Sequence, residues 1–433
     1  MNDLKSKLRH LLLLGSICLT LNPVAFGSDE VPGAPQRKPI ALTNATLHPV
    51  SSKPIEGGTL VFDQGRIVAL GTKVKIPDGA QVIDLKQKHV YPSLIESHSQ
   101  IGLKEINAVR ATRDERETGS LNPNAKAATA VNPDSEVIPV TRANGVLLAL
   151  SAPSGGSISG FAAMLQLDGW TSEDITLKQK AALVIDWPSP PSSGESPGLK
   201  ILQRTFRQAR AYRKARQANK EGQSFDIRLE ALLPVLDGDV PVMVLANDAR
   251  EIQASVAFAS EEGIRLIIFG GHDAEQCAAL LKQADVPVVI DSTHHRPRRR
   301  HEAYDTAYTL PSRLKRAGIR FCISGSDRAS TWNSRNLPYH AATAAAHGLS
   351  ADDALRSVTL SAAEILGIAD RVGSLEVGKD ATLIVTDGDP LETVTNVERA
   401  WIQGRSVQLS SRHTRLYEKY NQKYRQLQQS DGE

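Results

Sequence analysis

The sequence predicts an α/β protein in which a (β/α)8 TIM barrel carries a small β-sandwich built from both ends of the chain. Two observations predict this fold. Eight apolar, strand-like runs lie between residues 90 and 323, several of them separated by helical patterns, and a closed barrel of this kind needs eight strands. Short alternating runs with turn residues also precede and follow this region, and the two sets can pair with each other.

The first 27 residues have the order of a secretory signal peptide. Three basic residues precede the apolar run 11–21, and Ala25 and Gly27 are small residues at the two positions that a signal peptidase reads. The run is shorter than the roughly 20 residues that a membrane span needs. We therefore expect residues 1–27 to be removed, the mature chain to have no membrane anchor, and the protein to be exported to the periplasm.

The composition is that of a globular protein, with 41% hydrophobic and 23% charged residues. Removal of residues 1–27 takes away three of the 51 basic residues and one of the 48 acidic ones, so 48 minus 47 leaves a net charge of +1. No nucleic acid is therefore expected as a partner. Cys277 and Cys322 remain, which is too few for a disulfide framework, and we expect both to be buried.

The N-terminal part of the sandwich is expected at residues 38–89. Ile40–Leu47 has a strand pattern, and Asp63-Gln64-Gly65 can close a hairpin between two further alternating runs. The C-terminal part is expected at residues 369–409, where similar β patterns recur. The remaining residues, 410–433, are expected to form a helix or tail.

The barrel is expected at residues 90–368. Its predicted strands are apolar runs bounded by turn or helix signals. They lie at residues 90–97, 146–150, 162–167, 182–185, 240–245, 264–269, 286–290 and 320–323.

Two other segments of the barrel region have a clear character. Residues 198–220 are rich in Arg, Lys, Gln and Ala and predict a long helix with a solvated face. The polar segment 104–137 follows the first strand and is too long for a simple connection. Loops after barrel strands form the functional face, so we expect this segment to be a lid or wall over it.

The most informative stretch is residues 90–103, V-Y-P-S-L-I-E-S-H-S-Q-I-G-L. Its apolar run ends in polar groups at the point where a barrel strand delivers side chains to a pocket. His98 and Gln100 are two residues apart, so on an extended backbone their side chains point the same way. We expect them to line one cavity.

At this stretch the chain resembles the amidohydrolase superfamily, metal-dependent (β/α)8-barrel hydrolases that include imidazolonepropionases and dihydroorotases. The first barrel strand of the superfamily ends in H-x-H within a phrase such as P-G-L-I-D-x-H-x-H, and the phrase from Pro92 to Gln100 reads P-S-L-I-E-S-H-S-Q. Residues 373–391 resemble the superfamily's C-terminal signature. The resemblance extends from about residue 38 to 408 and implies the barrel and the split sandwich.

The resemblance also implies metal ligands at the ends of strands one, four, five, six and eight. Three residues at these ends match the pattern by kind, and two are amides where it has histidine. The implied metal set is His98, His272 and Asp327, which match, with Gln100 and Asn247, which do not. Neutral amides are poor zinc ligands, so we expect at most one divalent ion, with zinc as the first choice, or none.

The same resemblance assigns the chemistry. Asp327 and His272 are the expected catalytic residues, because an ion that they hold with His98 would activate a water whose proton Asp327 takes. Strand four offers only Asp186 for the residue that bridges two ions, so a two-ion centre is not expected.

A basic segment follows the seventh strand on the functional face. His294, His295 and Arg296 are the expected substrate-binding residues, because such groups can hold an anionic group such as a carboxylate. The alternative is a solvated loop, as most charge runs are.

Two functions remain open. The first is an exported amidohydrolase-like enzyme that hydrolyses a carbon–nitrogen bond of a small cyclic amide, amidine or dipeptide-like substrate. The alternative is a catalytically inactive periplasmic binding or scaffold protein that keeps the fold. Both are compatible with a homo-oligomer, and the metal content of protein purified without chelators separates them.

Overall fold

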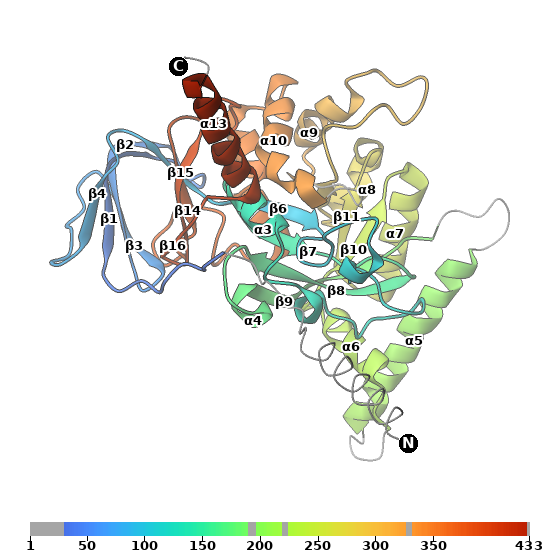
Figure 1. Cartoon of the computed structure of the whole chain (residues 1–433). Helices are drawn as coiled ribbons and strands as arrows, with labels where there is room; N and C mark the ends of the chain where they lie inside the picture. Colours follow the sequence, from blue (N-terminus) through green and yellow to red (C-terminus); the bar gives the residue numbers. More distant parts are fainter. Residues whose placement is uncertain (1–29, 189–195, 219–223, 326–330, 431–433) are drawn as a thin grey trace, which may run out of the picture. The chain divides into compact units, whose positions relative to one another are not determined.

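The structure, a computed structural model, describes residues 30–188, 196–218, 224–325 and 331–430. The predicted signal peptide and Asp327 lie outside these described residues. Two eight-stranded sheets organise the described chain: a nearly closed barrel, and a mixed sheet to which both chain ends contribute (Figure 1). The predicted α/β fold class is confirmed.

The mixed sheet joins segments from the two ends of the chain. Its strand order is β16-β15-β14-β5-β1-β2-β3, with β4 paired beside β1. The two ends meet where β5 runs antiparallel to β14, with Val90 opposite Val385. The strands are β1 (Ile40–Leu47), β2 (Ile55–Asp63), β3 (Arg66–Gly71), β4 (Gln81–Asp84), β5 (His89–Pro92), β14 (Leu383–Thr386), β15 (Val397–Ile402) and β16 (Arg405–Val407).

The hairpin predicted at Asp63-Gln64-Gly65 connects β2 and β3. Gln64 and Gly65 form its two-residue turn, and both have positive φ, 47° and 79°. A turn with two positive φ values matches the right-handed twist of the flanking strands, which is why glycine is favoured there. The local sequence therefore sets the register of this pair.

The mixed sheet is one continuous sheet that curls over its own core, where a sandwich was expected. Phe62 of β2 packs edge-on against Trp401 of β15, with 5.7 Å between ring centroids. The N–H of Ala381 donates to the carbonyl of Gly65 at 2.7 Å, which ties the β2–β3 turn to the C-terminal segment. The two ends thus stabilise each other as predicted.

All eight predicted barrel strands are present. Their order around the barrel is β13-β12-β11-β10-β9-β8-β7-β6. The first predicted run is divided at Ser93, so that β5 belongs to the mixed sheet and β6 starts the barrel. The barrel strands are β6 (Leu94–Ser99), β7 (Val146–Ser151), β8 (Ile158–Gln166), β9 (Thr176–Ile185), β10 (Val242–Ala246), β11 (Leu266–Gly270), β12 (Val288–Ile290) and β13 (Phe321–Ile323).

The third barrel strand, β8, runs against its neighbours. It pairs antiparallel with both β7 and β9, whereas β6 with β7 and the pairs from β9 to β13 are parallel. A short loop joins β7 to β8, because antiparallel strands need no crossover helix. The beginning of β8 therefore lies at the end of the barrel where the parallel strands finish, which we call the barrel mouth.

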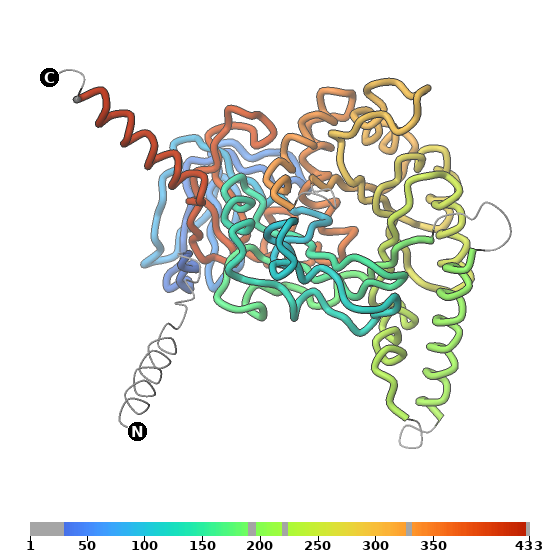
Figure 2. The backbone as a smooth tube through the Cα atoms, turned by 45° about the vertical axis from the view of Figure 1, so that its right-hand side comes forward, coloured from blue at the N-terminus to red at the C-terminus, as the bar shows by residue number. Residues whose placement is uncertain are grey.

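Helices surround the barrel where the alternating pattern predicted them. The predicted helix at 198–220 is α5, and it runs beside α6 (Figure 2), with a hydrogen bond of 2.7 Å from the Tyr212 hydroxyl to Glu230. The helices are α2 (Ala127–Ala130), α3 (Val137–Arg142), α4 (Ser172–Ile175), α5 (Pro197–Ala218), α6 (Ile227–Leu236), α7 (Ala249–Glu262), α8 (Ala278–Gln283), α9 (Thr306–Ala317), α10 (Leu337–Ala346), α11 (Ala351–Ser357), α12 (Leu360–Leu366) and α13 (Arg412–Ser430), with 3-10 turns η1 (Arg110–Thr112), η2 (Ala274–Cys277) and η3 (Thr331–Asn336).

The polar segment 104–137 forms a wall on β8. Its backbone continues the sheet beyond the end of β7: the N–H of Ile158 donates to the carbonyl of Ser120 at 3.0 Å, and the N–H of Phe161 donates to that of Ala125 at 2.8 Å. These hydrogen bonds satisfy backbone groups at the start of β8, which extends beyond the end of β7. The segment is therefore attached to the sheet at residues 120–126.

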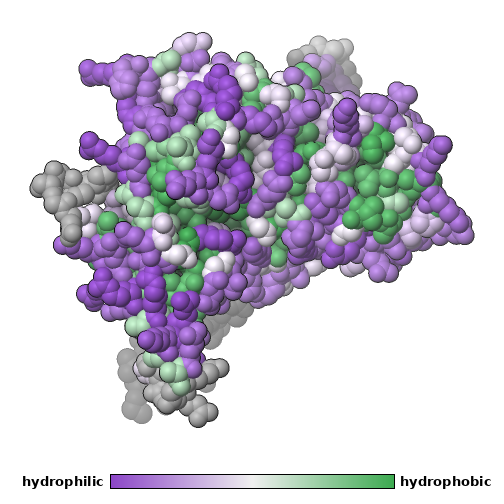
Figure 3. Space-filling view, turned by 180° about the vertical axis from the view of Figure 1, so that it is seen from behind, coloured by the Kyte–Doolittle hydropathy of each residue, from purple (hydrophilic) through white to green (hydrophobic). Residues whose placement is uncertain are grey.

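Apolar side chains fill the inside of the barrel. Leu150, Met243, Ile267, Val289 and Cys322 belong to one buried cluster that α12 closes. Cys277 and Cys322 are buried and free, as expected. The surface is mostly hydrophilic, with a hydrophobic area over the mixed sheet (Figure 3). None of the helices in the described ranges is both long and apolar enough to cross a membrane.

Candidate functional site

β6 reaches the barrel mouth through a bulge. Glu96 pairs with Ala149 and Ser99 with Ser151, so β6 has one more residue than β7 between these pairs. Such a bulge interrupts the alternation of side chains and re-aims them. His98, in the bulge, is 3% exposed, and its ring stacks on Phe269 of β11 with 3.8 Å between centroids and 17° between planes.

Gln100 follows the bulge and contacts different partners. Its Nε2 donates to the Ser154 hydroxyl at 3.1 Å, in the β7–β8 loop. Gln100 is only 4% exposed, and its Oε1 is buried. This oxygen accepts no hydrogen bond from the described residues. A buried acceptor without a donor is uncommon and calls for a water, an ion or a ligand as its partner.

The loop that holds Gln100 is itself anchored at the mouth. The N–H of Ser154 donates to the carbonyl of Glu115 in the wall at 2.7 Å, and the N–H of Gly155 donates to the Asp186 carboxylate, at the end of β9, at 3.2 Å. Ser154 is thus fixed on both sides. The orientation of the Gln100 amide follows from these anchors.

Asn247 and His272 end the next two strands. The Asn247 amide lies against Gly270 so closely that a Cβ on Gly270 would come within 2.6 Å of its oxygen. His272 contacts a carboxylate: its Nε2 lies 2.9 Å from Oε1 of Glu302, in the loop after β12. Glu302 is nearly buried, and although burial opposes it, the contacts with His272 and with backbone N–H groups lower the pKa of Glu302 to about 2.

Arg299 clamps three loops of the mouth together. Its guanidinium bonds to Asp248 after β10 at 2.7 Å, to Asp273 after β11 at 2.7 and 2.8 Å, and to Glu302 at 3.1 Å. Burial alone would raise the pKa of Asp273, but Arg299 holds it below its usual value. The planar fork of arginine suits this multiple bonding. Arg299 therefore acts as a structural clamp between these loops.

The contact between β6 and β13, here called the seam, depends on Glu96. This carboxyl is fully buried and accepts hydrogen bonds from the Ser324 hydroxyl at 2.5 Å, from the N–H of Gly325 at 2.9 Å and from the N–H of His98 at 3.1 Å. Burial nevertheless raises the pKa of Glu96 to about 7. Glu96 thereby connects the strand of His98 to the segment that leads to Asp327.

Of the predicted substrate-binding residues, His294 lies against α10. The Nε2 of His294 is 2.8 Å from the Thr343 hydroxyl, its ring is 4.0 Å from that of His340, and burial lowers the pKa of His294. His295 lies 3.2 Å from Asp291, and Arg296 is exposed. Their contact with a substrate stays a prediction.

The described residues do not fit a metal ion. Within the described part of the chain, no group of three or more His, Cys, Asp or Glu side chains is placed to hold one. Of the expected set, His272 is engaged by Glu302 and Gln100 donates to Ser154, while the His98 ring stacks on Phe269 through its face. Only Asp327 falls outside the described residues.

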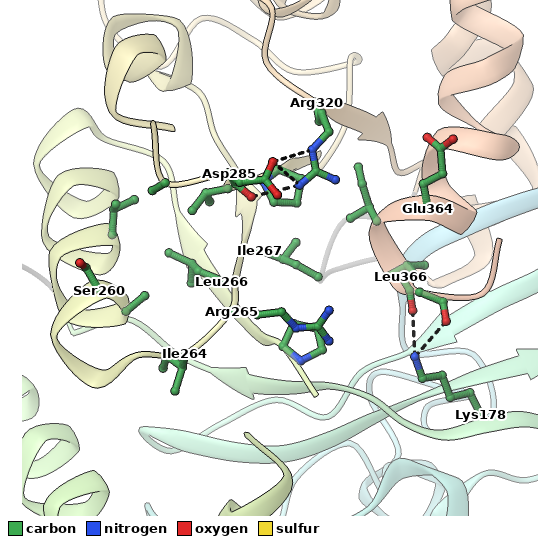
Figure 4. A pocket seen from close by; sticks show the side chains of 18 residues that line it. Lys178, Ser260, Ile264, Arg265, Leu266, Ile267, Asp285, Arg320, Glu364 and Leu366 are labelled. Carbon is green, nitrogen blue, oxygen red and sulfur yellow. Dashed lines mark hydrogen bonds and ion pairs between the residues drawn. The ribbon is translucent and has the colours of Figure 1, made fainter. Parts of the chain in front are cut away.

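A different hollow lies at the opposite end of the barrel (Figure 4). This cavity of about 420 Å³ is lined by residues at the starts of β11, β12 and β13 and by α12. Its cationic groups have protein partners: Lys178 donates to the carbonyls of Leu366 and Gly367, and Arg320 pairs with Asp285 at 2.8 Å. The lining therefore stabilises the base of the barrel.

Three residues that shape the mouth were not predicted from the sequence. Glu96 stands at the acidic position of the quoted phrase and could have been recognised there. Phe269 looked like any core residue of an apolar run. Arg299 looked like its exposed neighbours, because two of its three acidic partners are 26 and 51 residues away in sequence.

Comparisons with known proteins agree with this architecture. Residues 239–407 match the model of a family described as "Amidohydrolase family". The chain is 22% identical over 408 residues to the amidohydrolase tasK of Hapsidospora irregularis, covering 83% of this chain and 41% of that protein. It is 23% identical over 368 residues to an imidazolonepropionase of Mesorhizobium japonicum, covering 77% of this chain and 87% of that one.

The structure also resembles solved structures. An amidohydrolase from Thermotoga maritima MSB8 superposes with a TM-score of 0.76 and 27% sequence identity, covering 85% of this chain and 99% of that one.

Proposed function

Because the chain belongs to the amidohydrolase superfamily, we propose that it hydrolyses a carbon–nitrogen bond of a small cyclic amide, amidine or dipeptide-like molecule bound at the barrel mouth. Members of this family typically use a metal ion. The described residues do not supply a ligand set, so the proposal concerns the reaction class and the recognition of the substrate.

The observation that carries the proposal is the acceptor of Gln100. Its buried Oε1 lies at the end of β6, on the face where barrel proteins bind their substrates. An amide or amidine substrate has an N–H group that can donate a hydrogen bond to such an oxygen. Gln166 offers a comparison: its Oε1 is also buried without a donor, but it ends the reversed strand β8 at the opposite end of the barrel.

These two glutamines give a matched test. Gln100→Met keeps the size of the side chain and removes the acceptor, and we expect KM to rise about ten-fold or more, since a buried hydrogen bond is worth roughly 1–3 kcal/mol. Gln166→Met should leave KM unchanged. The measurement is amine or ammonia release from a panel of lactams, cyclic imides and dipeptides. Equal effects of the two variants on KM would contradict the role of Gln100.

A second candidate is a non-catalytic binding protein. The pairing of His272 with Glu302 favours it, because this imidazole is already engaged by a carboxylate of the protein. Metal analysis of protein purified without chelators separates the two candidates. One equivalent of metal per chain, together with turnover, supports the enzyme; ligand binding without metal or turnover supports the binding protein.

A further inference from the structure

The C-terminal helix α13 exposes large apolar side chains. Leu416, Tyr417, Tyr420, Tyr424 and Leu427 are between 39% and 70% exposed, although residues of this kind are normally covered. Figure 2 shows the helix, in red, reaching away from the rest of residues 31–433. Among the described residues, none of these five side chains belongs to a buried hydrophobic cluster.

These five side chains form one face. At 3.6 residues per turn, each step along a helix rotates the side chain by about 100°, and the five positions then fall within an arc of about 100°. The same rotation per residue places three polar side chains on the opposite side of the helix: Arg415, Gln422 and Arg425. We call the apolar arc the tyrosine face; the helix carrying it is about 28 Å long, from 19 residues at 1.5 Å each.

The rest of the helix is basic. It has five Arg and Lys residues and one acid, Glu418, so five minus one gives a net charge of +4 with histidine neutral. Contacts with the body lie near the start of the helix: Arg415 pairs with Glu136 at 3.9 Å, and His413 contacts Arg335 at 2.9 Å. The later turns carry much of the tyrosine face beyond these contacts.

We propose that α13 lies in the surface of an anionic lipid bilayer, with the tyrosine face toward the acyl chains. A basic polar face opposite a Leu and aromatic face is the composition of helices that lie in the membrane interface. Tyrosine suits this position, because its ring is apolar while its hydroxyl stays among the head groups. Pairing of two copies is less suitable, since it would bury six tyrosine hydroxyls between two helices of charge +4 each.

Vesicle binding tests the proposal. The protein as isolated from cells should sediment with phosphatidylglycerol vesicles and much less with phosphatidylcholine vesicles, and added salt should weaken the binding. Replacing Tyr420 and Tyr424 together by Ser should reduce binding to phosphatidylglycerol about ten-fold or more, because it removes apolar area from the buried face. Lys419→Gln with Lys423→Gln should also reduce it.

The controls are on the same helix and elsewhere on the surface. Gln422→Ser with Gln426→Ser changes the polar face, and Tyr304→Ser removes a tyrosine that is 75% exposed outside α13; both should bind as the parent does. Equal binding to the two lipids, or parent-like binding by the double tyrosine variant, overturns the proposal. A dimer in light scattering that the tyrosine variant dissociates, without vesicle binding, assigns the face to a second copy and overturns it as well.

Discussion

Glu96 lies in the seam between the first and last barrel strands, where water does not reach it. Its pKa is about 7 in the folded protein and about 4.5 in the unfolded chain, so the folded state holds the proton more tightly. The resulting stability is present below about pH 4.5 and is lost as the pH rises to about 7, by at most roughly 3 kcal/mol.

Urea unfolding at several pH values checks this for Glu96. In Glu96→Gln the amide oxygen can still accept from the N–H of Gly325, and the amide nitrogen can donate to the Ser324 hydroxyl, which donates to the carboxyl of the parent protein. The glutamine cannot ionise, so we expect the loss of stability between pH 4.5 and 7 to become smaller. Other titrating groups are common to both proteins, so the difference between their curves isolates Glu96. Identical slopes would show that the carboxyl does not titrate in this range.

Arg299 makes a separate prediction at the same scale. Arg299→Gln leaves Asp273, which is 6% exposed, without its cation, and we expect the free energy of unfolding to fall by about 2 kcal/mol. Arg299→Lys should recover part of the lost free energy of unfolding, because lysine restores the positive charge but not the planar guanidinium group that bonds to several carboxylates. The exposed Arg300, one residue later in the same loop, is the control: Arg300→Gln should change little.

Among the elements, the wall formed by residues 104–137 depends on a glycine of β8. A Cβ on Gly160 would lie 2.7 Å from the carbonyl oxygen of Ala125, and the residue has φ +128°. Gly160→Ala should therefore detach the wall and make it sensitive to proteases, as mapped by limited proteolysis. Gly238→Ala is the control, because Gly238 also has positive φ but nothing within 4 Å of its added Cβ, and it should cost only about 1 kcal/mol.

The elements also mark where prediction from sequence succeeds and stops. The eight barrel strands could be found because each is an apolar run, but an apolar run has no direction, so the reversal of β8 was not visible. The bulge at residues 97–98 was not visible for another reason: side-chain direction was inferred from a regular alternation, which a bulge interrupts. The hairpin at Asp63-Gln64-Gly65 was predicted correctly, because a two-residue turn is determined by its local sequence.

For the whole molecule, the pairing of the chain ends predicts the result of a truncation. A chain ending at Gly367 lacks β14, β15 and β16, so β5 loses its partner and Phe62 loses Trp401. We expect this chain to be insoluble, as measured by the soluble fraction after expression. A soluble monomer with a cooperative unfolding transition would show that the ends fold independently.

Export is a second prediction for the whole molecule. The basic, apolar and small-residue order of residues 1–27 predicts cleavage near Ser28. N-terminal sequencing of protein from the cell envelope should therefore begin near Ser28. Recovery of chains that begin at Met1 would argue against a cleaved signal.

The pairing of β5 with β14 also has a consequence in time. Val90 and Val385 are 295 residues apart, and ribosomes add about 5–20 residues per second, so β5 exists for roughly 15–60 s before its partner has been made. An unpaired strand edge is a template for association with other chains. During synthesis this edge of β5 is therefore open to association with other chains until β14 has been made.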